Sequence, residues 1–238
     1  MSDHTAGGPD LATHLTGIAR MLQARDGQQE TMDAIVRSAV GTVPGAEHAG
    51  IMTVLGRKEV RTVATTGDLP CAVDQAQFDV GEGPCLRALF DEKVVSVPEL
   101  ARDPRWPAFA ARAVELDVGS MLSFQLFVQD DDLGALNLYA TDVRAFDDES
   151  EHVGGLFAGH AAIALATAQQ REHLGEAART RDLIGQAKGI LMERHKLSAD
   201  QAFAVLARAS QLTNTKLRDI AEQLTRTGEL PTRPGGTG

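Results

Sequence analysis

The sequence has 238 residues, which is enough for two domains. It is 43% hydrophobic and 24% charged, and no apolar stretch is long enough to span a bilayer, so we expect a globular protein without a membrane partner. The net charge of −10 argues against nucleic-acid binding, but residues 176–238 contain ten basic and seven acidic residues, whereas residues 1–175 contain 13 basic and 26 acidic ones.

The N-terminal stretch and the cysteines predict the compartment. Residues 1–9 lack the basic and then apolar pattern of an export signal. Cys71 and Cys85 make neither a disulfide framework nor a spacing typical of a zinc site. We therefore expect a cytoplasmic protein, with no metal site.

The first third of the chain predicts helices followed by a hairpin. After a polar, glycine-rich tail, we expect two helices and then two strands around a tight turn. Their ranges are 1–9 for the tail, 10–25 and 29–42 for the helices, 49–55 and 59–65 for the strands, and 56–58 for the turn.

A long loop is predicted next, because residues 66–83 contain several glycines and a proline. Short helices and three more strands follow, and then one long helix. The expected ranges are 85–91 and 108–116 for the short helices, 94–97, 119–128 and 133–140 for the strands, 129–132 for an acidic turn, and 149–195 for the long helix. This order is typical of an α+β domain with an antiparallel sheet flanked by helices.

Four short motifs in this region carry a family resemblance. They are Gly-Glu-Gly-Pro-Cys at 81–85, Asp-x-Arg-Trp-Pro at 103–107, Ser-Met-Leu-Ser at 120–123 and Gly-Ala-Leu-Asn-Leu at 134–138. Through them, residues 15–170 resemble a GAF domain, which we place at residues 10–165. The resemblance implies a sensor domain, with a small-molecule ligand that the sequence does not identify.

The C-terminal region predicts three short amphipathic helices. The end of the long helix carries Leu183, Ile184, Ala187 and Leu191 at helical spacing. A second helix begins at Ser198, where Gln201 completes a capping box, and a third begins in the polar run 213–215. Three such helices can bury one shared core, and we expect Phe203 to lie in it.

The sequence of this bundle strongly resembles the ANTAR domain. The resemblance rests on Gln-Ala-Lys-Gly-Ile-Leu-Met at 186–192, on Ala-Phe-x-x-Leu at 202–206 and on Leu-x-x-Ile-Ala at 217–221. It implies a transcription antiterminator that binds stem-loops in nascent mRNA. A GAF domain followed by an ANTAR domain is a known pairing. We place the ANTAR domain at residues 181–230, a connecting helix at 166–180 and a C-terminal tail at 231–238.

The long helix also carries a heptad row, which favours a homodimer. Leu156, Ile163, Gln170, Ala177, Ile184 and Leu191 recur at intervals of seven. The first half of this helix is expected to pack on its own sheet. Beyond residue 167, a parallel coiled coil between two protomers is favoured over a monomer.

The residues expected to contact RNA are polar or basic side chains of the three C-terminal helices. Amides and arginines suit bases, lysines suit phosphates, and free N–H groups near 213–215 offer an anion site, although helix capping explains those residues as well. We expect the charged ends of Lys188, Arg208 and Lys216 to meet on one side. The full set is Gln186, Lys188, Arg194, Arg208, Gln211, Thr213, Asn214 and Lys216.

The two cysteines are the candidate residues of the sensor pocket. Cys85 follows Pro84 at the start of a helix, a position that lowers the pKa of a thiol, so a redox role or a ligand contact is one interpretation. A small buried side chain is the favoured one. A regulatory bridge between Cys71 and Cys85 lacks support in the sequence.

Two alternatives from other functional classes stay open. Some GAF-fold proteins reduce free methionine sulfoxide with cysteines in the pocket, but such an enzyme would leave the C-terminal bundle unexplained. Residues 198–224 also allow a helix-turn-helix that binds DNA, although Asp219 and Glu222 in its recognition helix disfavour that interpretation. We expect no enzyme activity.

Overall fold

The computed structural model describes residues 8–55, 59–128 and 131–231. The expected turn at 56–58 lies outside these residues, as do most of both expected tails and part of the turn at 129–132. The elements are α1 (Gly8–Gln23), α2 (Gln28–Thr42), β1 (His48–Leu55), β2 (Glu59–Thr65), α3 (Asp68–Val80), α4 (Pro84–Phe90), β3 (Val94–Val97), a 3-10 turn (Leu100–Arg102), α5 (Pro107–Glu115), β4 (Ser120–Val128), β5 (Asp131–Ala140), α6 (Asp148–His195), α7 (Ala199–Thr213) and α8 (Leu217–Thr227).

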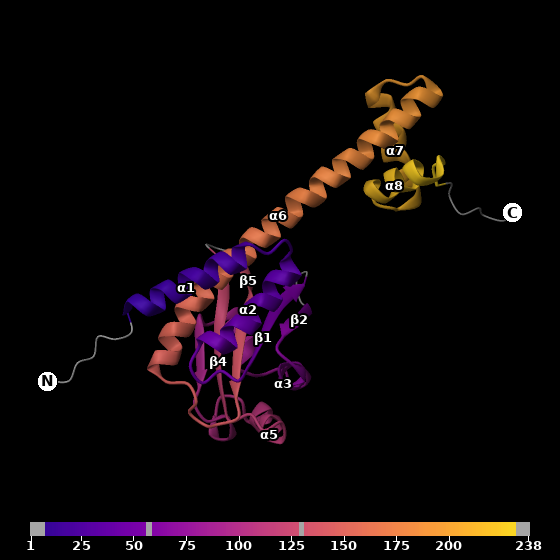
Figure 1. Cartoon of the computed structure of the whole chain (residues 1–238). Coiled ribbons are helices and arrows are strands. Elements are labelled where there is room, and N and C mark those ends of the chain that lie inside the picture. Colours follow the sequence, from indigo (N-terminus) through magenta and orange to yellow (C-terminus); the bar gives the residue numbers. More distant parts are fainter. Residues whose placement is uncertain (1–7, 56–58, 129–130, 232–238) are drawn as a thin grey trace. The chain divides into compact units, whose positions relative to one another are not determined.

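The chain forms two compact units, residues 1–170 and residues 171–238. The first contains an antiparallel sheet of five strands in the order β2-β1-β5-β4-β3 (Figure 1). Asn137 of the central strand β5 lies opposite Gly50 of β1 on one side and Ser123 of β4 on the other. The fold class is therefore α+β, as the sequence predicts.

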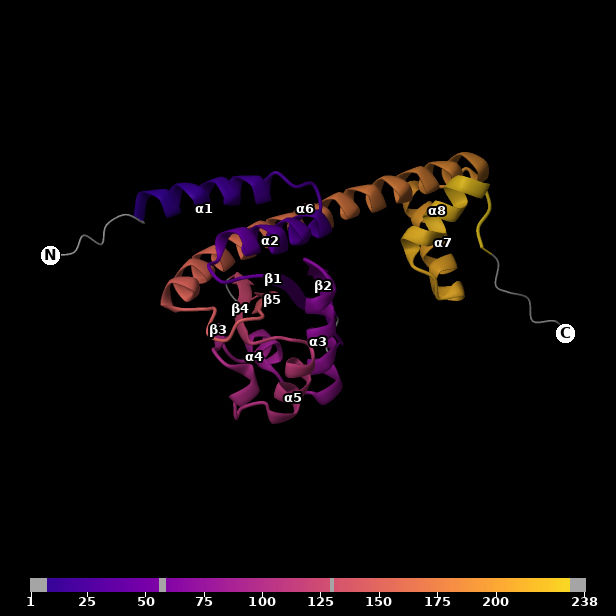
Figure 2. The ribbon, with the colours of Figure 1, turned by 60° about the horizontal axis from the view of Figure 1, so that its bottom comes forward.

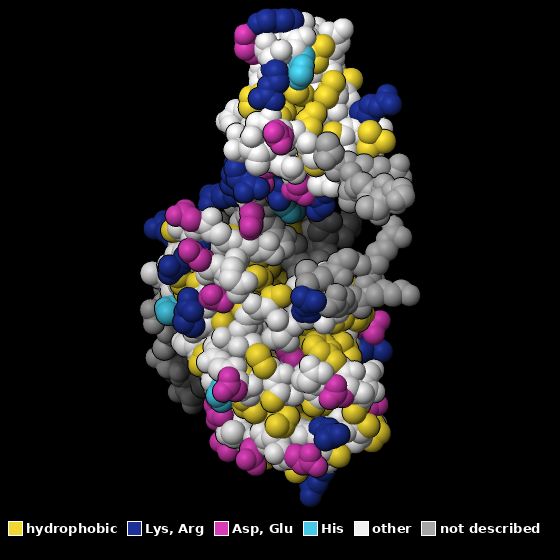
Figure 3. Space-filling view, turned by 90° about the vertical axis from the view of Figure 1, so that its right-hand side faces the viewer, with side chains coloured by type: hydrophobic (Ala, Val, Ile, Leu, Met, Phe, Trp, Pro, Cys, Tyr) yellow, Lys and Arg dark blue, Asp and Glu magenta, His cyan; other side chains and the backbone are white. Residues whose placement is uncertain are grey.

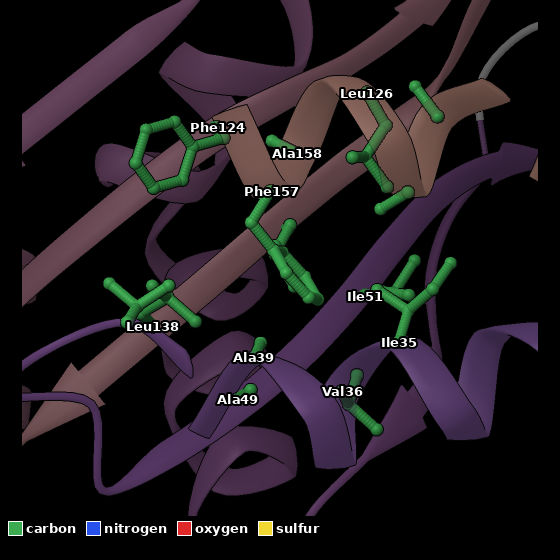
Figure 4. Close-up of a cluster of buried hydrophobic side chains, with 14 of the residues drawn as sticks. Ile35, Val36, Ala39, Ala49, Ile51, Phe124, Leu126, Leu138, Phe157 and Ala158 are labelled. Atoms are coloured by element: carbon green, nitrogen blue, oxygen red, sulfur yellow. The ribbon is translucent and has the colours of Figure 1, made fainter. Parts of the chain in front are cut away.

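One face of the sheet packs against α1, α2 and the first part of α6 (Figure 2). Ile35, Val36 and Ala39 of α2 meet Ile51 of the sheet, and Phe157 of α6 lies in the same core (Figure 4). Gly154 lets α6 approach closely, because a Cβ atom there would lie 2.4 Å from the ring of Phe124. The helix expected at 29–42 is thus present as α2, and it contributes one face to the core.

The opposite face of the sheet is covered by α3, α4 and α5 (Figure 2). Val73 of α3, Leu89 of α4 and Phe109 of α5 pack there against sheet residues such as Met52 and Met121. This second core also holds polar side chains, which form the first candidate site.

The helix α3 corrects the prediction of a long loop at 66–83. Pro70 lies in its first turn, where a missing N–H costs nothing, and Gly81 ends it with a left-handed φ of 71°. Two polar side chains, Asp74 and Gln77, occupy its buried face. They interrupt the apolar period, which is why the sequence pattern did not reveal a helix.

The second unit is a bundle formed by the end of α6 with α7 and α8. Its core contains Ala187, Leu191, Ala202, Leu206, Ile220, Ala221 and Leu224. Ser198 and Gln201 cap α7 reciprocally, as predicted. Asn214 ends α7 in a left-handed conformation, so α8 begins at Leu217, later than the predicted start in 213–215.

The middle of α6 carries no buried side chain. From residue 171 to residue 182 every side chain is exposed or half-buried. On the heptad row, Leu156 is 42% exposed and Ile163 is 51% exposed. Leu174 is 64% exposed and belongs to a companion row at the same interval of seven, which consists of Val153, His160, Thr167, Leu174 and Arg181. The first half of α6 packs on the sheet as expected, but it does so through Phe157 and Ala161, which lie off the heptad row.

No helix within the described residues has the length and apolar character needed to cross a bilayer. Basic and acidic side chains are interspersed on the face shown in Figure 3. The described residues of that face therefore form no extended patch of a single sign.

Candidate functional site

A buried polar cluster lies between the sheet and helices α3 and α4. Its six members are fully buried, and they are Asp74, Gln77, Cys85, Ser123, Asn137 and Tyr139. The alternation of strands β4 and β5 brings Ser123, Asn137 and Tyr139 to the same face of the sheet. The last turns of α3 and the start of α4 bring the other three.

Cys85 is held by the side chain of Gln77. The backbone N–H of Cys85 donates to Gln77 Oε1 at 2.9 Å, and Gln77 Nε2 donates to Cys85 Sγ at 2.9 Å. Gly83 makes this contact feasible, because its φ of 148° favours glycine and a Cβ atom would lie 2.2 Å from the Gln77 amide oxygen. The thiol is therefore a packed part of the fold.

The pKa of Cys85 is raised, although its position at the start of a helix would by itself lower it. Burial raises the pKa of this thiol well above its ordinary value, and the nearby carboxylate of Asp74 raises it further. A protonated thiol is a poor nucleophile and binds metals weakly. Cys71 is exposed on α3 and unpaired with Cys85, since both cysteines are free thiols.

Asp74 is the buried carboxylate of the cluster. It accepts hydrogen bonds of 2.6 Å from the hydroxyls of Tyr139 and Thr62. Burial raises its pKa to about 6, although both hydrogen bonds favour the charged form. Burial raises the pKa of Tyr139 as well.

Asn137 has the least satisfied side chain of the cluster. Both its amide nitrogen and its amide oxygen are buried without a hydrogen-bond partner among the described residues. Leaving such a group unpaired costs about 1–3 kcal/mol. Nothing in the amino-acid pattern singled out Asn137, because only the strand register shows that it faces this cluster.

The second candidate site is a groove in the C-terminal unit with a volume of about 1130 Å³. It is formed by α6, α7 and α8 together with the Lys216 cap. Four basic and two acidic residues line it, besides one histidine. Its lining consists of His173, Glu176, Ala177, Thr180, Arg181, Asp182, Ile184, Gly185, Gln186, Lys188, Phe203, Lys216 and Arg218. We call it the C-terminal groove.

The C-terminal groove collects three of the eight residues expected to contact RNA, namely Gln186, Lys188 and Lys216. Arg208 does not line it, and Arg218, which the sequence argument missed, does. Arg218 is bound by Glu176 with an N–O distance of 2.5 Å. Of the three cations expected to meet on one side, Lys188 and Lys216 line the groove together with Arg181 and Arg218.

The remaining expected residues lie elsewhere on the bundle. Arg194 donates to the carbonyl of Gly228 and lines a separate hollow with Gln186. Thr213 donates to the carbonyl of Ala209, and Asn214 is the left-handed cap of α7. Arg208 and Gln211 are exposed on α7.

Phe203 departs from the prediction of a core residue. Its neighbours Ala202 and Leu206 are fully buried, but Phe203 is 43% exposed and lines the C-terminal groove. It is the only Phe, Tyr or Trp after residue 170. Phe203 directly follows Ala202, so its side chain points about 100° away from that of the buried Ala202 around the helix. This difference was visible in the sequence.

Comparison with protein families assigns both units. Residues 26–166 match the GAF domain family, which is more than half of the chain, and residues 172–224 match the ANTAR domain family. This chain belongs to the GAF family and carries a C-terminal ANTAR domain. The resemblances inferred from the sequence are confirmed. An ANTAR domain points to a regulatory protein.

Solved structures confirm the GAF fold. A GAF domain of a phosphoenolpyruvate-protein phosphotransferase from Coxiella burnetii superposes with a TM-score of 0.56 at 18% identity, over 71% of this chain and 99% of the other. Free methionine-R-sulfoxide reductase from Neisseria meningitidis gives 0.52 at 17% identity, over 71% and 98%. The Stigmatella aurantiaca phytochrome photosensory core module gives 0.58 at 13%, over 89% and 46%. No curated protein matches the chain.

Proposed function

We propose that this GAF–ANTAR protein is a transcription antitermination regulator that binds stem-loops of nascent mRNA in the C-terminal groove. The observation that carries the proposal is the convergence of Gln186, Lys188 and Lys216 on one groove of the ANTAR unit. An amide offers both a donor and an acceptor to base edges, and ammonium groups suit phosphates. RNA loops present both kinds of group in unpaired form.

Two lysine ammonium groups of the groove are available to phosphates, besides the guanidinium group of Arg181. Among the described residues, neither Lys188 nor Lys216 forms an ion pair, whereas Arg218 is paired with Glu176. An unpaired ammonium group binds a phosphate without first losing a carboxylate partner. The bound hairpin is then held in a form that does not join a terminator, so that polymerase reads through. This role places the protein in the cytoplasm.

The GAF unit acts as the sensor in this proposal. The buried polar cluster supports a small polar ligand there, since the amide of Asn137 lacks a partner among the described residues and Asp74 and Tyr139 lie on the same face. We take residues 10–165 as the sensor, 166–180 as the connecting helix and 181–230 as the RNA-binding domain.

Homodimerisation through α6 completes the proposal. A stretch of twelve residues without a buried side chain is marginally stable as a lone helix in water. Leu156, Ile163 and Leu174 remain exposed on the two heptad rows. Pairing with a second α6 covers these side chains and brings two ANTAR domains together.

Crosslinking of the full-length protein to cellular RNA, followed by sequencing, tests the function. We expect enrichment of hairpins that lie upstream of terminators, and loss of that enrichment in a Lys188→Ala, Lys216→Ala double variant. Recovery of the same RNA by both proteins contradicts the proposal. Preference of the wild type for duplex DNA over the recovered hairpins favours the helix-turn-helix alternative.

The reductase alternative is not favoured. The Neisseria enzyme shares the fold at 17% identity, and a shared fold at this identity does not imply that this chain has the same activity. Cys85 is buried with a raised pKa and Cys71 is exposed and unpaired with it, which does not make a reactive dithiol.

A further inference from the structure

The exposed ring of Phe203 is an unusual feature of the C-terminal groove. An aromatic side chain contributes most to folding when it is buried, and the nearby positions Ala202 and Leu206 are fully buried. Phe203 instead leaves 43% of its surface exposed at the groove wall. Phe203 is thus only partly buried in the bundle core, and its ring is accessible to a planar group that enters the groove.

Gly185 also lines the C-terminal groove. It lies in the interior of α6, where glycine destabilises a helix relative to alanine. A Cβ atom at Gly185 would meet no heavy atom within 4 Å, so close packing within the protein does not require glycine. The bare backbone leaves space for a group that approaches the helix from the groove.

The remaining lining residues supply polar and charged partners. Lys188 and Lys216 carry positive charge, and Gln186 offers both a donor and an acceptor. The volume of about 1130 Å³ exceeds the roughly 300–1,000 Å³ that is typical of small-molecule pockets. The flat ring and the amide suit the base of a nucleotide, and the two ammonium groups suit its phosphate.

We propose that the C-terminal groove holds one unpaired base of an RNA loop, stacked on Phe203 and in contact with the α6 backbone at Gly185. This inference rests on the proposed RNA-binding function and adds the site and the mode of base capture. Stacking tolerates any base, because every base has a π face. The edge of the captured base is then read by Gln186.

Binding of the full-length protein to a hairpin recovered by crosslinking tests the inference. Phe203→Leu keeps an apolar side chain and removes the ring, so it is expected to weaken binding by roughly five- to 150-fold, the value of one stacked base. Phe203→Tyr is expected to bind like the wild type. Leu212→Ala, which alters an exposed apolar residue of α7 outside the groove lining, is the control and is expected to bind normally.

Gly185→Ala separates base capture from bundle stability. Alanine favours the helix, so the melting temperature is expected to stay or rise while RNA affinity falls, because the new methyl group occupies the space of the base. Gly17→Ala on α1, where a Cβ atom also meets nothing within 4 Å, is the control and is expected to leave RNA affinity unchanged.

Abasic substitutions in the loop identify the captured base. One loop position is expected to weaken wild-type binding when its base is removed, and to have little further effect on Phe203→Leu, because the two changes remove the same contact. If the wild type binds the hairpin but Phe203→Leu and Gly185→Ala bind equally tightly, base capture is wrong and the RNA-binding function stands. If the wild type binds no hairpin, the proposed function itself fails.

Discussion

At the scale of single residues, Asp74 is a buried carboxylate whose charge changes between acidic and neutral pH. Its carboxylate is fully buried and its pKa is raised to about 6. A carboxylate with a raised pKa binds its proton more tightly in the folded state than in the unfolded state. The stability that this proton gives is present below about pH 4 and is lost as the pH rises through about 6.

Replacement of Asp74 by asparagine should therefore stabilise the GAF unit at neutral pH. The amide side chain keeps the size of the carboxylate but removes the charge. We therefore expect the free energy of unfolding of Asp74→Asn, measured by urea denaturation at pH 8, to exceed that of the wild type by about 1–3 kcal/mol. The difference should shrink towards pH 4. Asp79→Asn, an exposed carboxylate on the same helix, is the control. An equal difference at pH 5 and pH 8 would show that ionisation of Asp74 does not matter.

Glu176 is one of the two acidic residues that line the C-terminal groove, where it would oppose the proposed binding of RNA. It lines the C-terminal groove and holds Arg218, so it neutralises a cation that otherwise faces phosphate. Glu176→Gln should tighten hairpin binding by roughly two- to fivefold at low salt, the size of one exposed ion pair, and less at high salt. Glu172→Gln, which changes the same charge on α6 outside the groove lining, should leave affinity unchanged. Equal effects of both variants would attribute the change to overall charge.

At the scale of elements, the exposed apolar side chains of α6 favour pairing with a second copy of this helix. The variant Leu174→Asp tests this proposed dimer. We expect the wild type to have the mass of a dimer in light scattering at micromolar concentration. The charge of Leu174→Asp falls in the paired surface and should shift the protein towards monomers. Ala178→Asp places the same charge on α6 off the heptad rows and should remain dimeric. A wild-type protein that is monomeric with and without RNA would refute the proposed pairing of two α6 helices.

The elements also differ in how well the sequence predicted them. Strands with alternating apolar residues, such as Glu59–Thr65 and Val94–Val97, have the predicted bounds, because one buried face imposes a period of two. Helix α3 was missed because Asp74 and Gln77 occupy its inward face. The C-terminal groove was predicted only in part, since the placement of Lys216 and Arg218 depends on where α8 begins, and the left-handed cap at Asn214 sets that point.

At the scale of the whole molecule, charge separates the two functions. Residues 1–175 contain 26 acidic and 13 basic residues, whereas residues 176–238 have a small basic excess. In the proposed function, the acidic GAF unit would repel RNA, so phosphate binding would depend on the cations of the C-terminal groove. The helix α6 belongs to both units. In the proposed function, this continuous element would carry a change in the sensor to the C-terminal groove.

The salt dependence of hairpin binding tests the groove most directly. We predict that Lys188→Ala and Lys216→Ala each weaken hairpin binding. Each variant should also make the negative slope of log affinity against log salt shallower by about 0.7–0.9, the value of one phosphate contact. Arg208→Ala removes an exposed charge of the same unit outside the groove lining and should leave the slope near that of the wild type. Unchanged slopes for both lysine variants, with a lowered slope for Arg208→Ala, would contradict the C-terminal groove as the RNA-binding site.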